Sequence, residues 1–223
     1  MDKAIKAPQC DPPLRPAEKG GWDLEIPIGD LPKPLDFPRV FGRTGPVEME
    51  VGSGSGLFLA TEAANRPDTN FFAVERDGAE VRRAKDKWRR RGLLNVRIVK
   101  CDAHYLLEEF VPDNSIDSYI ILYSDPWPKK RHHKRRFFQP RLLPTLERTL
   151  KPGGTVRIKT DVTVYYEVIR ELLGGAPFLR LEHDRRLDRE PDPDDVQTNY
   201  QRKAIEQGHP IHAMLYKRTT SGE

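Results

Sequence analysis

Residues 125–136 combine an acid, a rigid turn and a run of cations. They begin Asp-Pro-Trp-Pro and continue with six lysines or arginines and two histidines. The apolar residues 116–123 before them predict a buried strand, so the carboxylate of Asp125 should lie at the rim of a sheet. Pro126 and Pro128 fix φ and remove two backbone donors, which keeps helix out of the turn. A carboxylate can accept hydrogen bonds from the donor edge of a base, and a cation run can bind a phosphate backbone.

The cation run has a plain alternative interpretation, namely a proline turn followed by a solvated charged surface. The Asp-Pro-Trp-Pro sequence favours a functional site, because a solvated surface needs neither the acid nor the stiffened turn. The side chains that we expect to bind the nucleic-acid backbone are Lys130, Arg131, His132, Lys134, Arg135 and Arg136.

Strand and helix patterns alternate along the rest of the chain. Expected strands cover 47–51, 70–75, 96–100, 116–123, 156–160, 178–181 and 211–216, and expected helices cover 57–65, 77–91, 103–110, 137–150, 162–173 and 196–207. A strong turn is expected at 151–154 and an acidic, proline-containing loop at 184–195. This alternation predicts an α/β fold, with a doubly wound, mostly parallel sheet and helices on both faces.

Five successive expected strands end on or beside an acid. These acids are Glu50, Glu75, Asp102, Asp125 and Asp161. Ligands of such sheets bind beyond the carboxyl ends of the strands. One such acid is usually a cap or a surface residue, but five at equivalent places indicate a binding rim.

A glycine loop follows the first strand and precedes the first long helix. Its spacing is Gly-x-Gly-x-Gly, at Gly52, Gly54 and Gly56. Alone, this spacing is equally typical of a flexible turn, but its place between strand and helix favours a nucleotide site. Glu75 follows at the separation at which such sheets present an acid to ribose hydroxyls.

The acidic rim distinguishes between two nucleotide-like ligands. A dinucleotide carries a pyrophosphate, which carboxylates repel, whereas S-adenosylmethionine carries an ammonium, a sulfonium, hydroxyls and an amine. We therefore predict S-adenosylmethionine as the cofactor, with Glu50 at its methionine end, Glu75 at the ribose and Asp102 at the adenine amine.

Three motifs resemble those of known methyltransferases. Residues 50–56 resemble the first motif of class I methyltransferases, and residues 125–132 resemble the signature of the bacterial tRNA (guanine-N7)-methyltransferases. Thr198-Asn199-Tyr200, with Lys203 and Gly208, resembles their C-terminal substrate motif. The resemblance covers about residues 41–216 and implies a Rossmann-like, seven-stranded class I methyltransferase fold with an antiparallel last strand.

The resemblance implies methyl transfer from S-adenosylmethionine to N7 of a guanine in tRNA, at guanosine 46 of the variable loop. It implies cofactor contacts at Glu50, Glu75, Asp102 and Asp125, the last also catalytic. It implies substrate contacts at Lys129, Asp161, Thr198, Asn199, Tyr200 and Gln201. The chain departs from the family at Ser124, where a proline is usual, and at Asn199 and Gln201, where lysine and glutamate are usual. These departures bear on the choice of substrate rather than on the reaction type.

Two other functions are compatible with these motifs. The first is methylation of another RNA or of an exocyclic amine; amine methylases carry Asn or Asp followed by Pro-Pro-aromatic, which differs from Asp-Pro-Trp-Pro. The second is a catalytically silent RNA-binding protein on the same scaffold, against which the five rim acids argue.

Composition sets the remaining expectations. The 223 residues carry a net charge of +4 and fit one domain, with a proline-rich, partly disordered tail at 1–34 and a methyltransferase domain at 35–223. The two cysteines, Cys10 and Cys101, predict neither a disulfide framework nor a metal site. No apolar run reaches the length of a membrane span, and no signal segment is evident. We expect a cytoplasmic monomer or homodimer.

Overall fold

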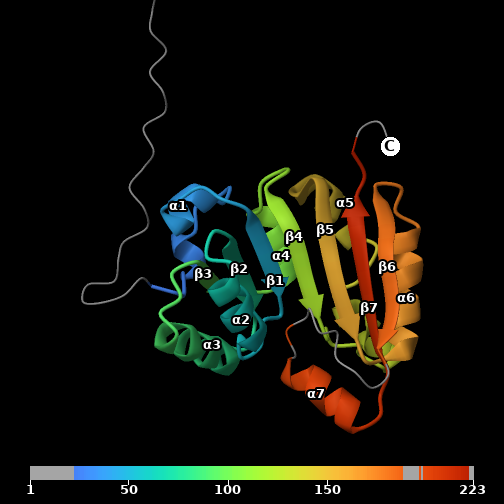
Figure 1. The fold of residues 1–223 in the computed structure, drawn as a ribbon. Helices are drawn as coiled ribbons and strands as arrows, with labels where there is room; N and C mark the ends of the chain where they lie inside the picture. Colours follow the sequence, from blue (N-terminus) through green and yellow to red (C-terminus); the bar gives the residue numbers. More distant parts are fainter. Residues whose placement is uncertain (1–22, 188–195, 197, 221–223) are drawn as a thin grey trace, which may run out of the picture.

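A seven-stranded sheet forms the centre of the molecule (Figure 1). The computed structural model describes residues 23–187, 196 and 198–220. The strands are β1 (Val47–Val51), β2 (Asn70–Glu75), β3 (Val96–Lys100), β4 (Ile116–Leu122), β5 (Leu150–Thr160), β6 (Leu179–Leu187) and β7 (Ile211–Arg218). Their order is β3-β2-β1-β4-β5-β7-β6, and only the pairings of β7 with β5 and β6 are antiparallel. The predicted fold class is confirmed, including its antiparallel last strand.

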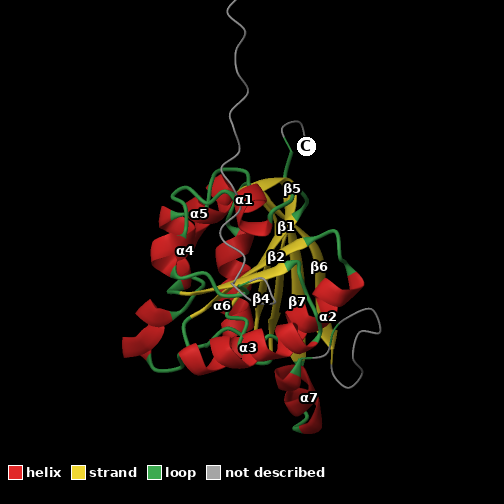
Figure 2. Ribbon diagram, turned by 90° about the vertical axis from the view of Figure 1, so that its left-hand side faces the viewer, coloured by secondary structure: helices red, strands yellow, loops and turns green. Residues whose placement is uncertain are grey.

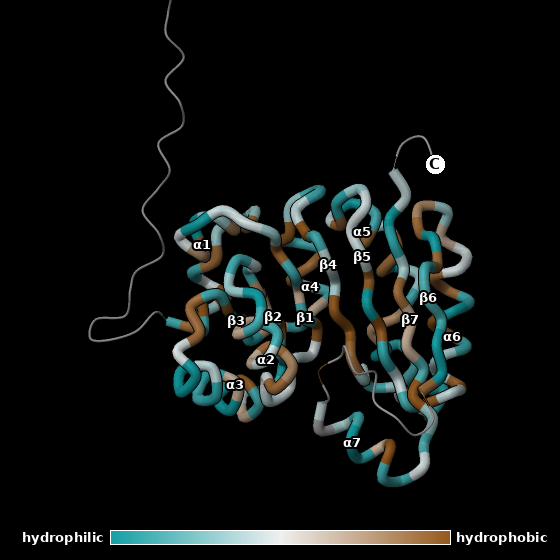
Figure 3. The backbone as a smooth tube through the Cα atoms, in the orientation of Figure 1, coloured by the Kyte–Doolittle hydropathy of each residue, from teal (hydrophilic) through white to brown (hydrophobic). Residues whose placement is uncertain are grey.

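Helices cover the sheet unevenly. The longer ones are α2 (Leu57–Asn65), α3 (Gly78–Arg90), α4 (Ala103–Glu109), α5 (Leu142–Thr149), α6 (Thr163–Gly174) and α7 (Asn199–Glu206); the short ones are α1 (Phe37–Phe41), η1 (Ile28–Asp30) and η2 (Lys130–Arg135). One buried cluster joins the sheet to α4, α5 and α6, and a second joins it to α2 and α3. The apolar strand segments stand out in Figure 3. In Figures 1 and 2, α6 lies on one side of β5, β7 and β6, and α7 lies at the carboxyl end of β5 on their other side, where Lys159 donates to Gln201.

Local sequence explains the elements that carry the rim. The Asp77 side chain accepts hydrogen bonds from the backbone N–H groups of Ala79 and Glu80, which caps α3. Trp88, Ala84 and Val81 form the buried face of this helix. Parallel pairing then brings the carboxyl ends of β1, β2, β3, β4 and β5 to one edge of the sheet.

Three elements differ most from their predicted bounds. Helix α5 begins at Leu142, not at residue 137, because Pro140 follows two aromatic residues that pack inwards as a loop. Strand β5 starts at Leu150 and absorbs the expected 151–154 turn as an irregularity in its pairing with β4. Strand β6 runs on to Leu187, so the first residues of the expected acidic loop are strand; the remaining residues of that loop, 188–195, lie outside the described part of the chain.

Part of the proline-rich segment packs on the domain. Leu24, Ile26 and Leu31 are buried, and the backbone N–H of Ile26 donates to the carbonyl of Ile98 at 2.9 Å. Residues 1–22, including Trp22 and Cys10, lie outside the described residues. Across the described part of the chain, no helix has the length and apolarity to cross a membrane.

Candidate active site

Two adjoining cavities open at the carboxyl edge of the sheet. The larger, of about 720 Å³, is lined by residues of the glycine loop, by Glu50 and Glu75, and by Thr198, Tyr200 and Lys203 of the α7 region. The smaller, of about 240 Å³, is lined by Asp102, Cys101, Trp127 and Arg135 among others. Both cavities are lined by Gly52, Glu75, Leu122, Tyr123 and Asp125. The structure therefore brings four of the five predicted rim acids to one connected space.

Glu50 is the most deeply buried of these acids. It is 3% exposed, and its Oε2 atom has no hydrogen-bond partner among the described residues. Burial raises the pKa of Glu50 well above the ordinary carboxyl value, and the charges of Glu75 and Glu62 raise it further. The buried Ser53 hydroxyl in the same cavity also lacks a partner among these residues. Two unpaired polar groups therefore face the space beside the glycine loop.

Glu75 braces the glycine loop. Its Oε2 accepts from the backbone N–H of Gly54 at 2.9 Å, and its Oε1 accepts from those of Arg76 and Asp77 at 2.7 and 2.8 Å. A carboxylate offers about four acceptor positions, so three internal bonds leave little more than one for a ligand. Replacement of Glu75 would therefore disturb the loop as well as any ribose contact, which the sequence alone did not indicate.

The three glycines of the loop are required for different structural reasons. Gly52, Gly54 and Gly56 all have positive φ, which favours glycine. A Cβ at Gly56 would also lie 2.7 Å from the Ala84 Cβ and from Cζ2 of Trp88, whereas one at Gly54 would meet nothing within 4 Å. The Trp88 indole N–H donates to the Gly56 carbonyl at 2.8 Å. Gly56 is therefore needed for packing against α3.

Asp102 lies at the other end of the connected space. Its Oδ1 accepts from the backbone N–H of Tyr105 at 3.2 Å, so it caps α4, and its side chain lines only the smaller cavity. Cys101 precedes it, and burial raises the pKa of the Cys101 thiol. The smaller cavity thus extends from Glu75 towards Asp102.

The Asp-Pro-Trp-Pro turn is held by its own acid. Asp125 Oδ1 accepts from the backbone N–H of Trp127 at 3.1 Å. Trp127 has φ 41° and Tyr123 has φ 54°, in the left-handed region that such bulky residues rarely adopt. Strained backbone on both sides of an exposed acid is typical of a functional site, because the surrounding structure must hold it in place.

The cation run forms η2, and its members differ in exposure. Lys130, Arg131, Lys134 and Arg135 are exposed, His132 is half-buried, and Arg135 lies over the Trp127 ring at 5.0 Å. Arg136 is buried: its Nε donates to the Pro126 carbonyl at 2.7 Å and its guanidinium lies over the Tyr165 ring. This position does not fit the predicted contact of Arg136 with RNA; the residue instead fastens the turn to α6.

Residues of helix α7 and its N-cap line the larger cavity. The Thr198 hydroxyl caps the helix by accepting from the Gln201 backbone N–H at 3.1 Å, and the Tyr200 ring stacks on Tyr123 at a centroid distance of 6.0 Å. Gln201 is fully buried, and its Oε1 accepts from Lys159 Nζ at 3.4 Å. Gln201 therefore faces the protein interior, away from the predicted substrate. Asn199 is the first residue of α7.

Lys129 and Asp161, like Gln201, are predicted substrate residues that line neither cavity. Lys129 is exposed just before η2, and Asp161 is half-buried just after β5. Asp161 nevertheless affects a residue that lines the cavities: burial and the charge of Asp161 both raise the pKa of Tyr123. Tyr123, Cys101 and Arg135 line the connected space without having been predicted to do so. The available signal was position: Tyr123 ends one expected strand, and Cys101 directly follows another.

Comparison with known proteins gives the family. Residues 44–214 match the family described as "Putative methyltransferase". A tRNA (guanine-N(7)-)-methyltransferase of Bordetella parapertussis is 36% identical over 200 residues, which is 89% of this chain and 76% of the relative. One of Pseudomonas putida is 34% identical over 207 residues, which is 92% of this chain and 84% of the relative. The chain belongs to the tRNA (guanine-N7)-methyltransferase family.

Solved structures agree with the fold of this methyltransferase family. An antibiotic-related methyltransferase superposes with a TM-score of 0.61 at 17% identity, covering 81% of this chain and 92% of that chain. The 16S rRNA methyltransferase KamB superposes with a TM-score of 0.58 at 15% identity, covering 82% of this chain and 93% of that chain. At these identities the likeness concerns the class I methyltransferase fold alone.

Proposed function

We propose that this chain transfers the methyl group of S-adenosylmethionine to N7 of a guanine in tRNA, forming 7-methylguanosine. The observation that carries the proposal is the connected space in which Glu50 and Glu75 meet Asp125 and Tyr200. A cofactor site and an exposed, aromatic-lined opening share that space. The family membership supports the same reaction.

The residues present fit S-adenosylmethionine. When bound, it supplies a methyl group on a positively charged sulfur. The unpaired Glu50 oxygen and Ser53 hydroxyl suit its charged methionine end, the remaining acceptor capacity of Glu75 suits the ribose, and Asp102 suits the adenine amine. The positive-φ glycines keep Cβ atoms out of the loop that would lie against it.

Guanine N7 needs no strong general base, since its lone pair is free in the neutral base. The task of the protein is to hold N7 in line with the methyl group, which can lower the barrier by roughly 7–11 kcal/mol. Asp125, and Asp161 beside Tyr123, are acceptors that can bind the N1–H and N2–H₂ groups of guanine. Asp125 therefore orients the base, while its bond to Trp127 fixes the carboxylate.

The Tyr123–Tyr200 stack is suited to the purine ring. Methylation at N7 leaves the purine positively charged, and an aromatic face attracts that charge more than it attracts neutral guanine. Tyr200 is 66% exposed at the opening, so its ring is available to a base. For the position in tRNA, we propose guanosine 46 of the variable loop, which the resemblance to the family implies; a loop base can leave its stack and enter such an opening.

The decisive experiment is nucleoside mass spectrometry. Bulk tRNA is incubated with the protein and methyl-labelled S-adenosylmethionine, digested and separated. We expect label in 7-methylguanosine, located in the variable loop by sequencing. Label in a methylated amine would replace the proposed reaction. If no nucleoside is labelled and calorimetry detects no binding of S-adenosylmethionine, the silent RNA-binding alternative is favoured instead.

A further inference from the structure

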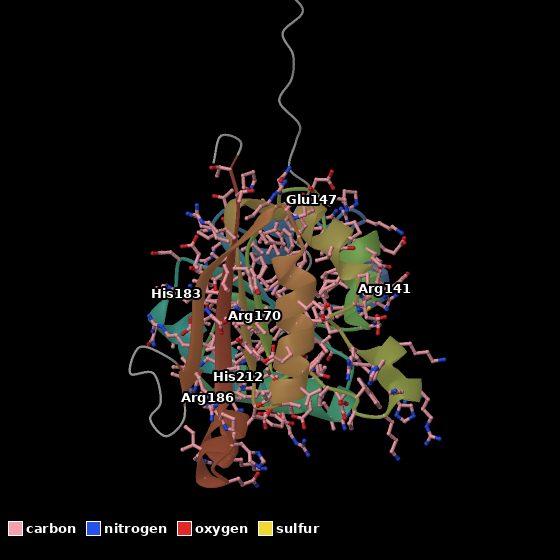
Figure 4. The ribbon with its side chains drawn as sticks, turned by 90° about the vertical axis from the view of Figure 1, so that its right-hand side faces the viewer. Arg141, Glu147, Arg170, His183, Arg186 and His212 are labelled. Atoms are coloured by element: carbon pink, nitrogen blue, oxygen red, sulfur yellow. The ribbon has the colours of Figure 1, made fainter. Side chains whose placement is uncertain are left out.

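The part of the sheet that is formed by β5, β7 and β6 has one open face. Contacts with α6 identify the covered face: Thr163 Oγ1 lies 3.0 Å from His212 Nε2, and the Tyr166 hydroxyl donates to Asp184 Oδ2 at 2.8 Å. Side chains alternate along strands, so the neighbours of His212 and Asp184 point to the opposite face. In Figures 1 and 2 the described helices leave this face uncovered apart from α7 at the carboxyl end of β5, and Figure 4 labels His183 on the other side of the strands from Arg141.

The strand register arranges the open face in three rows. We call these residues the open-face rows; from the amino end of β5 to its carboxyl end they are Thr155–Lys217–Arg180, Arg157–Leu215–His183 and Lys159–Ala213–Arg185. Every row contains at least one lysine or arginine. Within these rows, only Lys159 is buried.

The composition of the open-face rows is unusual for this kind of fold. Doubly wound sheets normally carry helices on both faces and fill them with aliphatic side chains. On the open face, lysine and arginine side chains instead surround the two apolar residues Ala213 and Leu215. Glu182, at the bulge of β6, accepts from Arg180 Nε at 2.8 Å, so this acid is paired with a cation of the rows. The face is therefore built to meet an anionic surface.

The open-face rows lead directly to the proposed active site. Lys159, in the row nearest the rim, donates to Gln201 of α7, the helix that carries Tyr200. The η2 cations approach from the other side of the sheet, since Arg136 lies over Tyr165 of α6. A polyanion held at the rim is thus flanked by cations on both faces of the sheet.

We propose that the open-face rows bind the sugar–phosphate backbone of the tRNA whose guanine occupies the site. This inference rests on the proposed function and extends it. Charge complementarity and continuity with α7 favour this occupant over a second copy of the chain, whose open face would carry the same charge. Backbone contacts of this kind fix the register of a nucleic acid without reading its bases.

The test compares two matched sets of substitutions in the full-length protein. The open-face variant is Arg157→Gln/Arg185→Gln/Lys217→Gln. The control is Lys33→Gln/Arg141→Gln, two exposed cations whose ion pairs with Glu109 and Glu108 place them beside α4, on the covered side. Affinity for unmodified tRNA is measured against salt concentration, together with S-adenosylmethionine affinity, melting temperature and single-turnover rate at saturating tRNA.

For the open-face variant we expect the slope of log affinity against log salt to fall by about 0.7 to 0.9 for each phosphate that the protein no longer neutralises. The control should keep the wild-type slope, and neither variant should change S-adenosylmethionine affinity or the saturating rate. An unchanged slope would overturn the inference while leaving the proposed function intact if 7-methylguanosine still forms. A lower melting temperature with an unchanged slope would instead assign the face to an occupant within the chain, for which the acidic residues 188–195 are the candidate.

Discussion

Glu50 links cofactor binding to pH. Because the pKa of Glu50 is raised, some molecules of the free protein keep this carboxyl protonated at pH values above the usual carboxyl range. Only the carboxylate can pair with the ammonium of S-adenosylmethionine, so affinity should increase as the pH rises through the Glu50 pKa, with a proton released on binding. Calorimetric titration in buffers of different ionisation enthalpy measures that release.

Glu50→Gln is the matched control for this prediction. We expect it to weaken binding by roughly 10- to 150-fold, the equivalent of about 1.5–3 kcal/mol for a charge-assisted hydrogen bond, and to abolish the proton release. Stability of the free protein follows the opposite trend, because the folded state binds this proton more tightly: the contribution of Glu50 is present at low pH and is lost as the pH rises through its folded pKa. A pH-independent affinity in the wild type would remove Glu50 from the methionine end.

Asp125 is predicted to act on turnover rather than on RNA affinity. Asp125→Ala and Asp125→Asn should each slow single-turnover methylation by roughly a hundredfold or more, since small misplacements of the base are costly. Asparagine should rescue little, because its amide can present a donor where guanine already donates. Overall tRNA affinity should change little, and filter binding beside the rate assay distinguishes the two effects. Near-normal rates would contradict the orienting role.

At the residue scale, the sequence predicted the positions of the acids that line the site better than it predicted the roles of other polar side chains. Acids at strand ends are placed by topology alone, and four of the predicted five line the connected space. The burial of Arg136 and Gln201 was not foreseen, because the sequence does not reveal which way a polar side chain points. Arg136 is buried over Tyr165, and Gln201 is buried against Lys159.

At the scale of elements, the α2–α3 packing depends on one glycine. Gly56→Ala should destabilise the protein by about 2–5 kcal/mol, since a Cβ there overlaps Ala84 and Trp88 and the backbone has φ 67°. Gly54→Ala is the matched control, with positive φ but open space, and should cost about 1–2 kcal/mol. Urea denaturation of the cofactor-free protein measures both; equal midpoints would contradict the packing account.

The elements themselves were largely predictable. The apolar strands β2 and β4 and the capped amphipathic helix α3 matched their expected bounds closely. Runs of apolar residues predict the buried strands, and the apolar face and N-cap residue predict the helix. The β6 extension was missed because residues 182–186 are polar and exposed, a pattern that does not distinguish an open sheet face from a loop. Its cause is tertiary: β7 supplies the antiparallel partner.

At the scale of the whole molecule, the η2 cations and the open-face rows lie on opposite faces of the sheet. Neutralising Lys129, Lys130, Arg131 and Arg135 should reduce the salt slope of tRNA affinity by about 0.7 to 0.9 for each phosphate left without its cation. Combined with the open-face variant, the two reductions should add, because the two surfaces share no side chain. Titrations of the two variants and their combination test this, and a combined slope no lower than that of either variant alone would mean that one surface is not used.

Trp88 gives the protein an internal optical reporter. Its indole is fully buried and hydrogen-bonded to the Gly56 carbonyl, directly behind the glycine loop. Emission from a buried indole shifts to longer wavelength when water reaches it, so ordering or opening of the loop changes the Trp88 spectrum without an attached dye. In a Trp22→Phe/Trp127→Phe background, Trp88 is the sole tryptophan of the chain. Stopped-flow emission from that variant would therefore follow the loop in real time as a ligand enters.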